Sequence, residues 1–391
     1  MPIADDIKES INKSSFIRKM FEEGIELKRK LGEENVFDFT IGNPDLNPPD
    51  AYYKIAGDIA LDRRKNIHGY MPNAGYDNVR KAMAEKASRE HACEVNYQNI
   101  VMTVGAAGGL NVLFRALLNP GDEIVVPKPY FAEYGAYAGN HRAVLKPVNS
   151  GSDFSLDVKA VEDALTDKTK IVLINSPHNP TGRVYDEESL KNLAQMLKKQ
   201  KNVGRHIYLV ADEPYREITY DGIVVPPVLS TYEESFVVTS FSKTLSLPGE
   251  RIGYIAQNPK MQDSALIMNA LILCNRILGF VNAPAFIQRV VGEIVDEKVD
   301  VAIYDSRRKI FVKGLEDAGL EYAKPEGAFY LFVKSPLDND IDFVDHLKKY
   351  GILSVPGSGF GGAGYIRFAY CVDEDIIKRA MPLLKKAVSE L

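Results

Sequence analysis

The sequence contains few cysteines and histidines, and neither type has the spacing of a metal site. Its three cysteines, Cys93, Cys274 and Cys371, are an odd number, which indicates a reducing compartment rather than a disulfide framework. Cys274 lies in an apolar segment, so we interpret it as a core residue and not as a nucleophile. The six histidines include no HExxH motif, and we expect no bound metal.

Long apolar runs and clusters of basic residues are also absent. No apolar stretch approaches the ~20 residues that a membrane-spanning helix needs, and the N-terminal MPIADDIKES has no signal-peptide core. The formal charge is −5, and no run of lysine and arginine stands out. These absences argue against a membrane or nucleic-acid partner, and we expect a soluble, cytoplasmic protein.

What the chain does contain is a regular alternation of strand-like and helix-like segments in its middle. Such alternation with short breaker loops predicts an α/β fold with a largely parallel sheet covered by helices on both faces. Strands are expected at residues 100–104, 123–126, 144–148, 171–174, 207–210, 236–238 and 252–256, with helices at 158–165 and 187–199 between some of them.

The two ends of the chain have a different pattern. An amphipathic helix is expected over residues 7–31, followed by a strand at 36–41. After Pro259, two long helical stretches (261–277 and 285–318) precede strands at 328–333 and 365–370. The 391 residues therefore predict two domains: a large domain over 48–284, and a small α+β domain formed by 1–47 and 285–391.

The stretch TSFSKTLSLPGERIGY, residues 239–254, carries the strongest chemical signal. Lys243 lies between two apolar strands, where desolvation favours the neutral amine, a nucleophile toward aldehydes. Ser240, Ser242 and Arg251 supply hydroxyl groups and a planar cation that suit a phosphate. An aldehyde and a phosphate on one ligand indicate pyridoxal 5′-phosphate. The alternative is that Lys243 lies exposed on a turn and Arg251 pairs with a surface carboxylate.

Other segments supply parts that such a cofactor needs. A small-residue loop, Gly105–Gly109, joins a predicted strand to a helix and would offer free N–H groups to a phosphate, although it is equally consistent with a tight turn. It is not GxGxxG, which argues against a nicotinamide cofactor. Gly42, in GNPD, would let a ligand approach the backbone; a plain turn is the alternative.

Polar residues at or just past the predicted strand ends complete the set. Asp212 suits the protonated pyridine nitrogen, and Asn179 and Tyr215 suit the phenolic oxygen. Phe131 would stack on the ring, and Arg367 would bind a substrate carboxylate. Because Asn179, Asp212 and Lys243 converge at strand ends, where ligands of α/β sheets bind, we favour the cofactor site over its alternatives.

The ordered motifs resemble those of class I/II aminotransferases, members of the fold-type I pyridoxal-phosphate superfamily. They run through most of the chain: GNPD, YMPNAG, VGAAGG, PYFAEY, NSPHNPTG, ADEPY, SFSKTLSLPGERIGY, KPEGAFYLF and VPGSGFGGAGYIRFAY. The resemblance implies a seven-stranded sheet in a large cofactor-binding domain and a smaller second domain. It also implies an enzyme that transfers amino groups between an L-amino acid and a 2-oxo acid.

The resemblance also implies roles for single residues. Lys243 would carry the internal aldimine and move the substrate's α-proton, while Asp212, Asn179 and Tyr215 contact the cofactor ring. Gly42, Asn179 and Arg367 would bind the substrate carboxylate, and Tyr70 would reach the cofactor phosphate of the other subunit in a homodimer. The phosphate would be held by Ser240, Ser242, Arg251 and the backbone amides of Ala106 and Ala107, positions where relatives often have Ser, Thr or Lys.

Three functional questions stay open at this point. Dicarboxylate-specific relatives carry an arginine that binds the distal carboxylate shortly before an NPP-like turn, and Arg276 precedes such a turn one residue out of step. We interpret Arg276 as an interface or surface residue, with a specificity arginine as the alternative, so aspartate or glutamate as donor stays open. A carbon–sulfur β-lyase acting on cystathionine or cysteine would use nearly the same residues. A ligand-sensing regulator is disfavoured, because the segment before Gly42 is short and not basic. His178 is interpreted as a loop residue rather than a catalytic base. Arg307–Arg308 is interpreted as a solvated helix face, and a domain-bridging role is the alternative that the resemblance leaves open.

Overall fold

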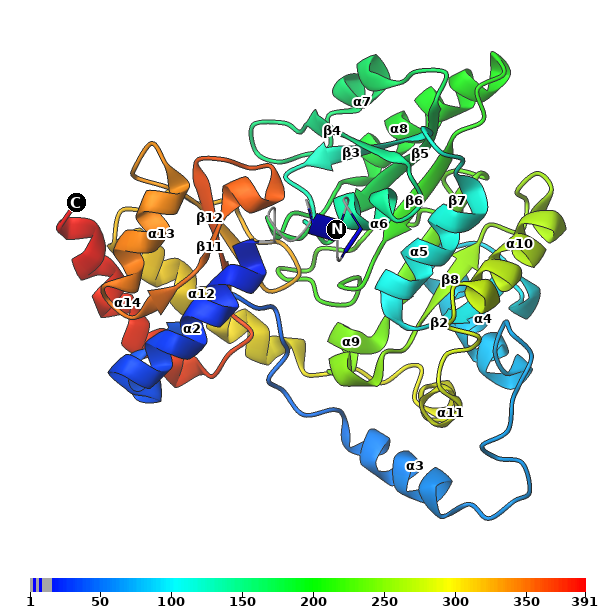
Figure 1. The fold of residues 1–391 in the computed structure, drawn as a ribbon, viewed down its shortest axis with the longest axis horizontal. Coiled ribbons are helices and arrows are strands. Elements are labelled where there is room, and N and C mark those ends of the chain that lie inside the picture. Colours follow the sequence, from blue (N-terminus) through cyan, green and yellow to red (C-terminus); the bar gives the residue numbers. More distant parts are fainter. Residues whose placement is uncertain (1–2, 5–6, 9–15) are drawn as a thin grey trace.

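The computed structural model describes residues 3–4, 7–8 and 16–391, which form a larger and a smaller lobe (Figure 1). The larger lobe is built on a seven-stranded sheet with the order β2-β8-β7-β6-β5-β3-β4. Only β8 runs against its neighbours, so the predicted α/β fold with a mainly parallel sheet is confirmed. The strands are β2 (Ile100–Thr103), β3 (Glu123–Lys128), β4 (Val144–Asn149), β5 (Thr169–Asn175), β6 (Tyr208–Asp212), β7 (Ser235–Ser240) and β8 (Gly253–Gln257).

Helices cover both faces of this sheet because successive strand side chains point to opposite faces. In β7, Phe236 and Val238 join the core under one set of helices, and Val237 joins the core under the other. The first face carries α5 (Gly105–Leu117), α6 (Tyr134–Gly139) and α10 (Ser264–Ile277). The second carries α4 (Asp77–His91), α7 (Val158–Ala164), α8 (Glu187–Asn202) and α11 (Ala285–Glu293).

The smaller lobe combines both ends of the described chain. Its antiparallel sheet has the order β11-β12-β9, and β1 pairs with β10 in parallel. Phe39, Phe311 and Phe368 pack edge-on or tilted in its buried core. Its elements are α2 (Phe16–Leu31), β1 (Phe37–Asp38), α12 (Val301–Asp317), β9 (Tyr330–Lys334), α13 (Asp340–Lys348), β10 (Ile352–Leu353), β11 (Val355–Pro356), β12 (Tyr365–Ala369) and α14 (Glu374–Ser389).

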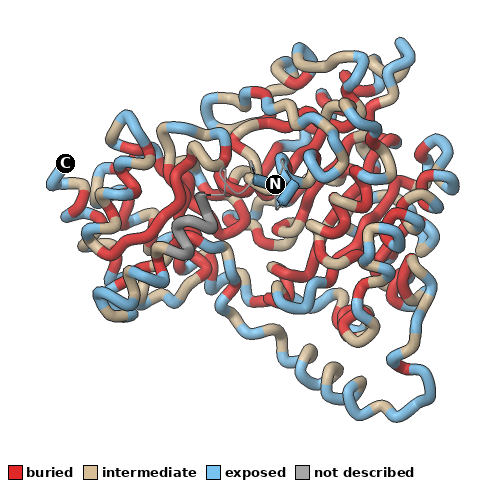
Figure 2. The backbone as a smooth tube through the Cα atoms, in the orientation of Figure 1, coloured by how far each residue is buried: buried red, intermediate tan, exposed pale blue. Residues whose placement is uncertain are grey.

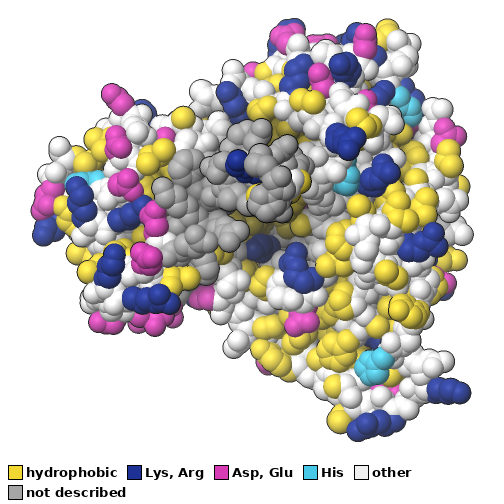
Figure 3. All heavy atoms as spheres, in the orientation of Figure 1, with side chains coloured by type: hydrophobic (Ala, Val, Ile, Leu, Met, Phe, Trp, Pro, Cys, Tyr) yellow, Lys and Arg dark blue, Asp and Glu magenta, His cyan; other side chains and the backbone are white. Residues whose placement is uncertain are grey.

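The remaining helices lie at the edge of the larger lobe or are short. Helix α3 (Asp50–Leu61) has no fully buried residue, although Ala51, Tyr52 and Ile55 are partly buried against the core of that lobe; its exposure contrasts with the buried sheets (Figures 1 and 2). Helix α9 (Phe241–Thr244) lies between β7 and β8. Acidic and basic side chains are interspersed over the face drawn in Figure 3. In the part of the chain that the structure describes, no helix is long and apolar enough to cross a membrane.

The structure corrects several predicted boundaries. The single helix expected over 285–318 is wrong, because residues 294–300 separate α11 from α12 and the Asp300 side chain caps the N-terminus of α12. The strand expected at 36–41 is only two residues long, and of the helix expected over 7–31, residues 9–15 lie outside the described residues. Helix α11 packs on α3 and α4 of the larger lobe. The exact domain boundaries stay a prediction.

Candidate active site

A cavity of about 310 Å³ lies at the carboxyl edge of the large sheet and reaches the smaller lobe. The parallel strands β5, β6 and β7 end there at Asn175, Asp212 and Ser240. The structure brings every predicted site residue except Tyr70 into the lining of this cavity: Gly42, Ala106, Ala107, Phe131, Asn179, Asp212, Tyr215, Ser240, Ser242, Lys243, Arg251 and Arg367.

The carboxylate of Asp212 is buried at the end of β6. Tyr134 Oη donates to Asp212 Oδ2 at 2.5 Å, whereas Oδ1 has no hydrogen-bond partner among the described residues. Burial raises the pKa of Asp212 to about 7, and the bond from Tyr134 opposes the rise. A buried acceptor without a partner destabilises a protein unless a ligand supplies the donor, and a protonated ring nitrogen would do so. Sequence analysis misses Tyr134, because its contact joins residues 78 positions apart.

Two asparagines connect the ends of β5 and β6. Asn175 Nδ2 donates to the Asp212 carbonyl at 2.7 Å, and its Oδ1 accepts from the Asn179 backbone N–H at 2.7 Å. The Asn179 side chain is thereby held over the cavity, where its Oδ1 accepts from Arg367 Nη1 at 2.9 Å. Asn175 lines the cavity and has no predicted role. The sequence feature that could have pointed to Asn175 is its position as a polar residue at the end of an apolar strand.

The amine of Lys243 projects into the cavity from α9. It donates to the Gly42 carbonyl at 2.6 Å and lies 5.4 Å from the centroid of the Phe329 ring. Burial is the largest cause that lowers the pKa of Lys243, to about 8. With that pKa, roughly a tenth of the amine is neutral at pH 7, against less than a thousandth for an ordinary lysine. Lys243 is thus an activated amine rather than an exposed turn residue.

Backbone N–H groups and a guanidinium face one another at the other end of the cavity. Helix α5 begins at Gly105 without a side-chain cap, so its first amides, including those of Ala106 and Ala107, are free for a ligand. Gly105 has φ +68°, and a Cβ there would lie 3.0 Å from Arg251 Nη2. This arrangement, with Ser240 and Ser242 beside it, offers the donors and positive charge that suit a phosphate.

Arg367 approaches the cavity from β12 of the smaller lobe. It is buried between two rings, with its guanidinium carbon 4.6 Å from the centroids of both Tyr330 and Phe360. Nη2 donates to the Thr40 carbonyl at 2.6 Å, and Nε has no partner among the described residues. The guanidinium therefore retains an unused donor in a rigid position, which suits a carboxylate.

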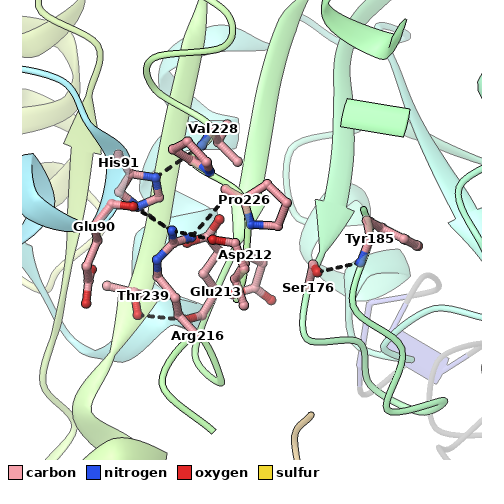
Figure 4. Close-up of polar contacts among 12 residues, drawn as sticks. Glu90, His91, Ser176, Tyr185, Asp212, Glu213, Arg216, Pro226, Val228 and Thr239 are labelled. Atoms are coloured by element: carbon pink, nitrogen blue, oxygen red, sulfur yellow. Dashed lines mark hydrogen bonds and ion pairs between the residues drawn. The ribbon is translucent and has the colours of Figure 1, made fainter. Parts of the chain in front are cut away.

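A buried polar network supports the segment that carries Asp212 and Tyr215 (Figure 4). Arg216 Nη1 donates to Glu213 Oε2 at 2.9 Å, and His91 Nε2 lies 3.4 Å from the same oxygen. Arg216 also donates to the backbone carbonyls of Glu90, Val225 and Pro226. Burial raises the pKa of Glu213 to about 7 and lowers that of His91 well below 6.5. The network anchors residues 212–216, a segment whose Asp212, Pro214 and Tyr215 line the cavity.

The other residues singled out in the sequence lie away from the cavity. Tyr70 is 98% exposed in the loop after α3, and Arg276 is exposed near the end of α10. Cys274 is a buried core residue, which confirms its interpretation. His178 lies in a loop as expected, but it is buried and its Nδ1 is 2.7 Å from Thr181 Oγ1.

The interpretation of Arg307–Arg308 as a solvated helix face is wrong. Both side chains are buried, because each forms a two-pronged ion pair with a distant segment. Arg307 binds Asp45 at 2.6 and 2.8 Å, and Arg308 binds Asp221 at 2.9 Å through each of two nitrogens. Helix α12 is thereby fastened to the segment after β1 and to the loop after β6. The partners lie 262 and 87 residues away, so local sequence does not reveal them.

The residues of the cavity fit pyridoxal phosphate. The free Asp212 Oδ1, the activated Lys243 amine and the open amides of α5 lie in one lining, and each matches a different chemical group of that cofactor. A mainly parallel seven-stranded sheet with this site at its carboxyl edge defines a pyridoxal-phosphate-dependent enzyme of fold type I.

Comparison with known proteins narrows this class. Residues 34–382 match the family described as "Aminotransferase class I and II". The chain is 34% identical over 372 residues to a probable aspartate/prephenate aminotransferase of Thermus aquaticus, covering 93% of this chain and 94% of that one. It is 30% identical over 384 residues to a probable aspartate aminotransferase of Methanocaldococcus jannaschii, covering 96% and 97%.

Solved structures agree with the sequence relatives. An aminotransferase from Eubacterium rectale superposes with a TM-score of 0.96 at 38% identity, covering 100% of this chain and 99% of that one. A single mutant of aspartate aminotransferase from Thermus thermophilus superposes with a TM-score of 0.87 at 26% identity, covering 99% of this chain and 100% of that one. The chain belongs to the class I and II aminotransferase family, and it is a transferase whose cofactor is pyridoxal 5′-phosphate.

Proposed function

We propose that this aminotransferase uses Lys243 as its catalytic amine and takes an acidic L-amino acid, such as aspartate, as donor to a 2-oxo acid. The observation that carries the proposal is the shared cavity of Lys243 Nζ, the free Asp212 Oδ1 and the partly unpaired Arg367 guanidinium. Two of the relatives described above are named for aspartate, which supports the choice of donor.

The binding roles follow from the contacts. Asp212, held by Tyr134, pairs with the cofactor's ring nitrogen, and Phe131 at the cavity wall packs on the ring. Asn179 and Tyr215 contact the phenolic oxygen. Ser240, Ser242, Arg251 and the amides of Ala106 and Ala107 hold the phosphate. The substrate carboxylate binds Arg367, close to Gly42 and Asn179.

Bound pyridoxal phosphate supplies an aldehyde carbon that bonds to amines and a ring that accepts electrons. The protein supplies the proton transfers. Lys243 Nζ would take the proton from the substrate α-carbon and hold it for its return. A pKa near 8 suits a group that must both accept and release a proton near neutral pH. Because Arg367 fixes the carboxylate, the α-carbon is presented to the amine in one orientation.

The distal carboxylate of an acidic substrate needs a further cation. Among the described lining residues, the cations of the cavity are Lys243, Arg251 and Arg367, and the roles above use all three. We propose that Arg276 of a second subunit reads the distal carboxylate, because it is exposed near the end of α10. Arg276→Ala should then lower kcat/KM for aspartate roughly 10- to 100-fold, the worth of a charge-assisted pair, and leave alanine unchanged.

Substrate kinetics with a matched surface variant test the role of Arg276. Arg205→Ala removes another exposed arginine, which pairs with Asp167, and should alter neither substrate. An unchanged ratio of aspartate to alanine activity in Arg276→Ala would remove Arg276 from substrate recognition.

We further propose a cytoplasmic homodimer in which Tyr70 reaches the cofactor phosphate of the other subunit. The nearly complete exposure of Tyr70 supports this, since the described residues cover almost none of its side chain. Other large exposed apolar side chains lie on α3, on α10 and after it: Tyr53, Leu61, Leu266, Leu273, Ile277 and Val281. Exposed apolar side chains in such numbers are typical of an interface.

A spectral titration of the purified protein with a panel of L-amino acids tests the proposed function. We expect acidic amino acids to convert the resting chromophore and a 2-oxo acid to restore it. Lys243→Ala should lack the resting absorbance while retaining its fold by circular dichroism. Persistence of the chromophore while cystathionine or cysteine yields pyruvate and ammonia would instead establish the β-lyase, and a normal chromophore in Lys243→Ala would disprove the role of the lysine.

A further inference from the structure

Two buried tyrosine hydroxyls from different lobes meet beside the cavity. Tyr330 of β9 and Tyr215, which follows β6, have their Oη atoms 2.7 Å apart, and either oxygen is able to donate. Both side chains are at least 96% buried and line the cavity. Tyr215 is assigned to the cofactor's phenolic oxygen, whereas Tyr330 has no role in the function proposed above.

The direction of the hydrogen bond between Tyr330 and Tyr215 decides whether Tyr215 has a proton to donate to the cofactor. Burial raises the pKa of Tyr330 to about 12 and that of Tyr215 well above 10, so both hydroxyls keep their protons near neutral pH. One proton lies in the bond between the oxygens, and neither hydroxyl makes another hydrogen bond within the described chain. If Tyr215 donates to Tyr330, it has no proton left for the cofactor. If Tyr330 donates, the Tyr215 proton is free to point into the cavity.

The surroundings of Tyr330 favour it as the donor. The Arg367 guanidinium lies 4.6 Å from its ring centroid, and a nearby cation stabilises the negative charge that builds up on a donating oxygen. Gly42 leaves room for the hydroxyl: a Cβ there would lie 2.0 Å from Tyr330 Oη.

We propose that Tyr330 is a positioning residue that donates to Tyr215 and so directs the Tyr215 proton to the phenolic oxygen of the cofactor. This inference rests on the proposed role of Tyr215. A hydroxyl that accepts a hydrogen bond becomes a stronger donor, because successive bonds polarise one another. Tyr330 therefore helps to stabilise negative charge on the phenolic oxygen without touching it.

The experiment is a pH titration of the resting absorbance of the cofactor-loaded protein. A donor to the phenolic oxygen favours the deprotonated chromophore and lowers the pH midpoint of its colour change. Tyr330→Phe should raise the midpoint by a few tenths of a unit, the scale expected for one cooperative bond. Tyr215→Phe should raise it more, and adding Tyr330→Phe to Tyr215→Phe should cause no further change, because the recipient is gone.

Two further variants distinguish an effect of the Tyr330 hydroxyl from an effect of altered core packing. Tyr304 lies in the same hydrophobic core as Tyr215 and Tyr330, and its buried hydroxyl has no hydrogen-bond partner among the described residues. Tyr304→Phe should therefore leave the midpoint unchanged. Gly42→Ala keeps Tyr330 but displaces its hydroxyl, and should move the midpoint in the same direction as Tyr330→Phe.

The possible results are distinct. An unchanged midpoint in Tyr330→Phe, or equal shifts with and without Tyr215, would overturn the inference while leaving the proposed function intact. An unchanged midpoint in Tyr215→Phe would overturn both the inference and the role assigned to Tyr215. A pH-dependent shift of kcat alone, without a spectral shift, would also count against Tyr330 as a positioning residue.

Discussion

At the scale of single residues, burial favours the neutral forms of Asp212 and Lys243, because it raises the pKa of the aspartate and lowers the pKa of the lysine. The pKa of Asp212 rises to about 7 and that of Lys243 falls to about 8. In both cases desolvation disfavours the charged form, which is positive for lysine and negative for aspartate. The cavity therefore contains groups that are destabilised as ions until a ligand pairs them, and this is the physical basis for its affinity for a charged cofactor.

The first prediction concerns Asp212 in the cofactor-free protein. Its folded pKa of about 7 exceeds the unfolded value of 3.8, so the folded state binds more protons between these limits. The free energy of unfolding should fall as pH rises through this window, and Asp212→Asn should abolish that contribution. The variant should gain stability relative to the native chain between pH 5 and pH 8, by at most about 4 kcal/mol.

Thermal unfolding at a series of pH values measures this difference. Exposed Glu188 provides the control, because Glu188→Gln removes a carboxylate without changing a buried site. Parallel pH profiles for Asp212→Asn and the native chain would contradict the raised pKa. The same variant should bind the cofactor but turn over orders of magnitude more slowly, since the ring nitrogen loses its anionic partner.

At the scale of elements, the end of the cavity that we propose holds the phosphate depends on how α5 begins. Gly105 adopts φ +68°, a region that costs other residues about 1–2 kcal/mol, and it lies against Arg251. The tight turn lets the first amides of the helix and the guanidinium converge on one point. Helix α12 has a comparable structural role, because Arg307 and Arg308 fasten it to segments before and within the larger lobe.

The second prediction is that Gly105→Ala weakens cofactor binding by roughly 5- to 30-fold, the equivalent of that backbone strain. With alanine at position 105, we expect the start of α5 to relax to a less strained backbone conformation when no ligand is bound. Binding of the phosphate would require the strained conformation again, and this requirement lowers the affinity. Gly121→Ala is the matched control: Gly121 has φ +86° in the loop between α5 and β3, but a Cβ there contacts nothing. It should lower stability without lowering affinity. Equal affinity losses in the two variants, measured by titration with pyridoxal phosphate, would show that strain at α5 has no special role.

At the scale of the whole molecule, the site is assembled from both lobes. Lys243 and Asp212 come from the larger lobe, Arg367 and Tyr330 come from the smaller one, and Gly42 lies in the segment between β1 and α3. Tyr70, in contrast, is exposed. A homodimer would complete the site by supplying Tyr70 to the partner.

The third prediction tests shared sites by mixing two inactive variants, Tyr70→Ala and Lys243→Ala. In a mixed dimer, one site combines native Lys243 with native Tyr70, so random mixing should restore about one quarter of native sites. Each variant alone should stay weak or inactive at the same total concentration. Failure to regain activity, although sedimentation shows that mixed dimers form, would contradict the exchange of Tyr70.

Sequence alone determined the class of fold and most of the site. The strand-like runs at 171–174, 207–210 and 236–238 are local patterns, with Asn179, Asp212 and Lys243 at or just past their ends. Parallel strands necessarily gather their carboxyl ends at one edge. Lys243, Arg251 and Arg367 were predictable because each carries a charge beside an apolar strand, which requires a ligand or a partner.

Only the tertiary structure decided which residues hold these groups in place. Tyr134 beneath Asp212, Tyr330 beside Tyr215, and the partners of Arg307 and Arg308 come from distant parts of the chain. The break between α11 and α12 likewise follows from packing on different lobes. Local periodicity reports which face of an element is buried, but it does not say against what, because that depends on how the two lobes meet.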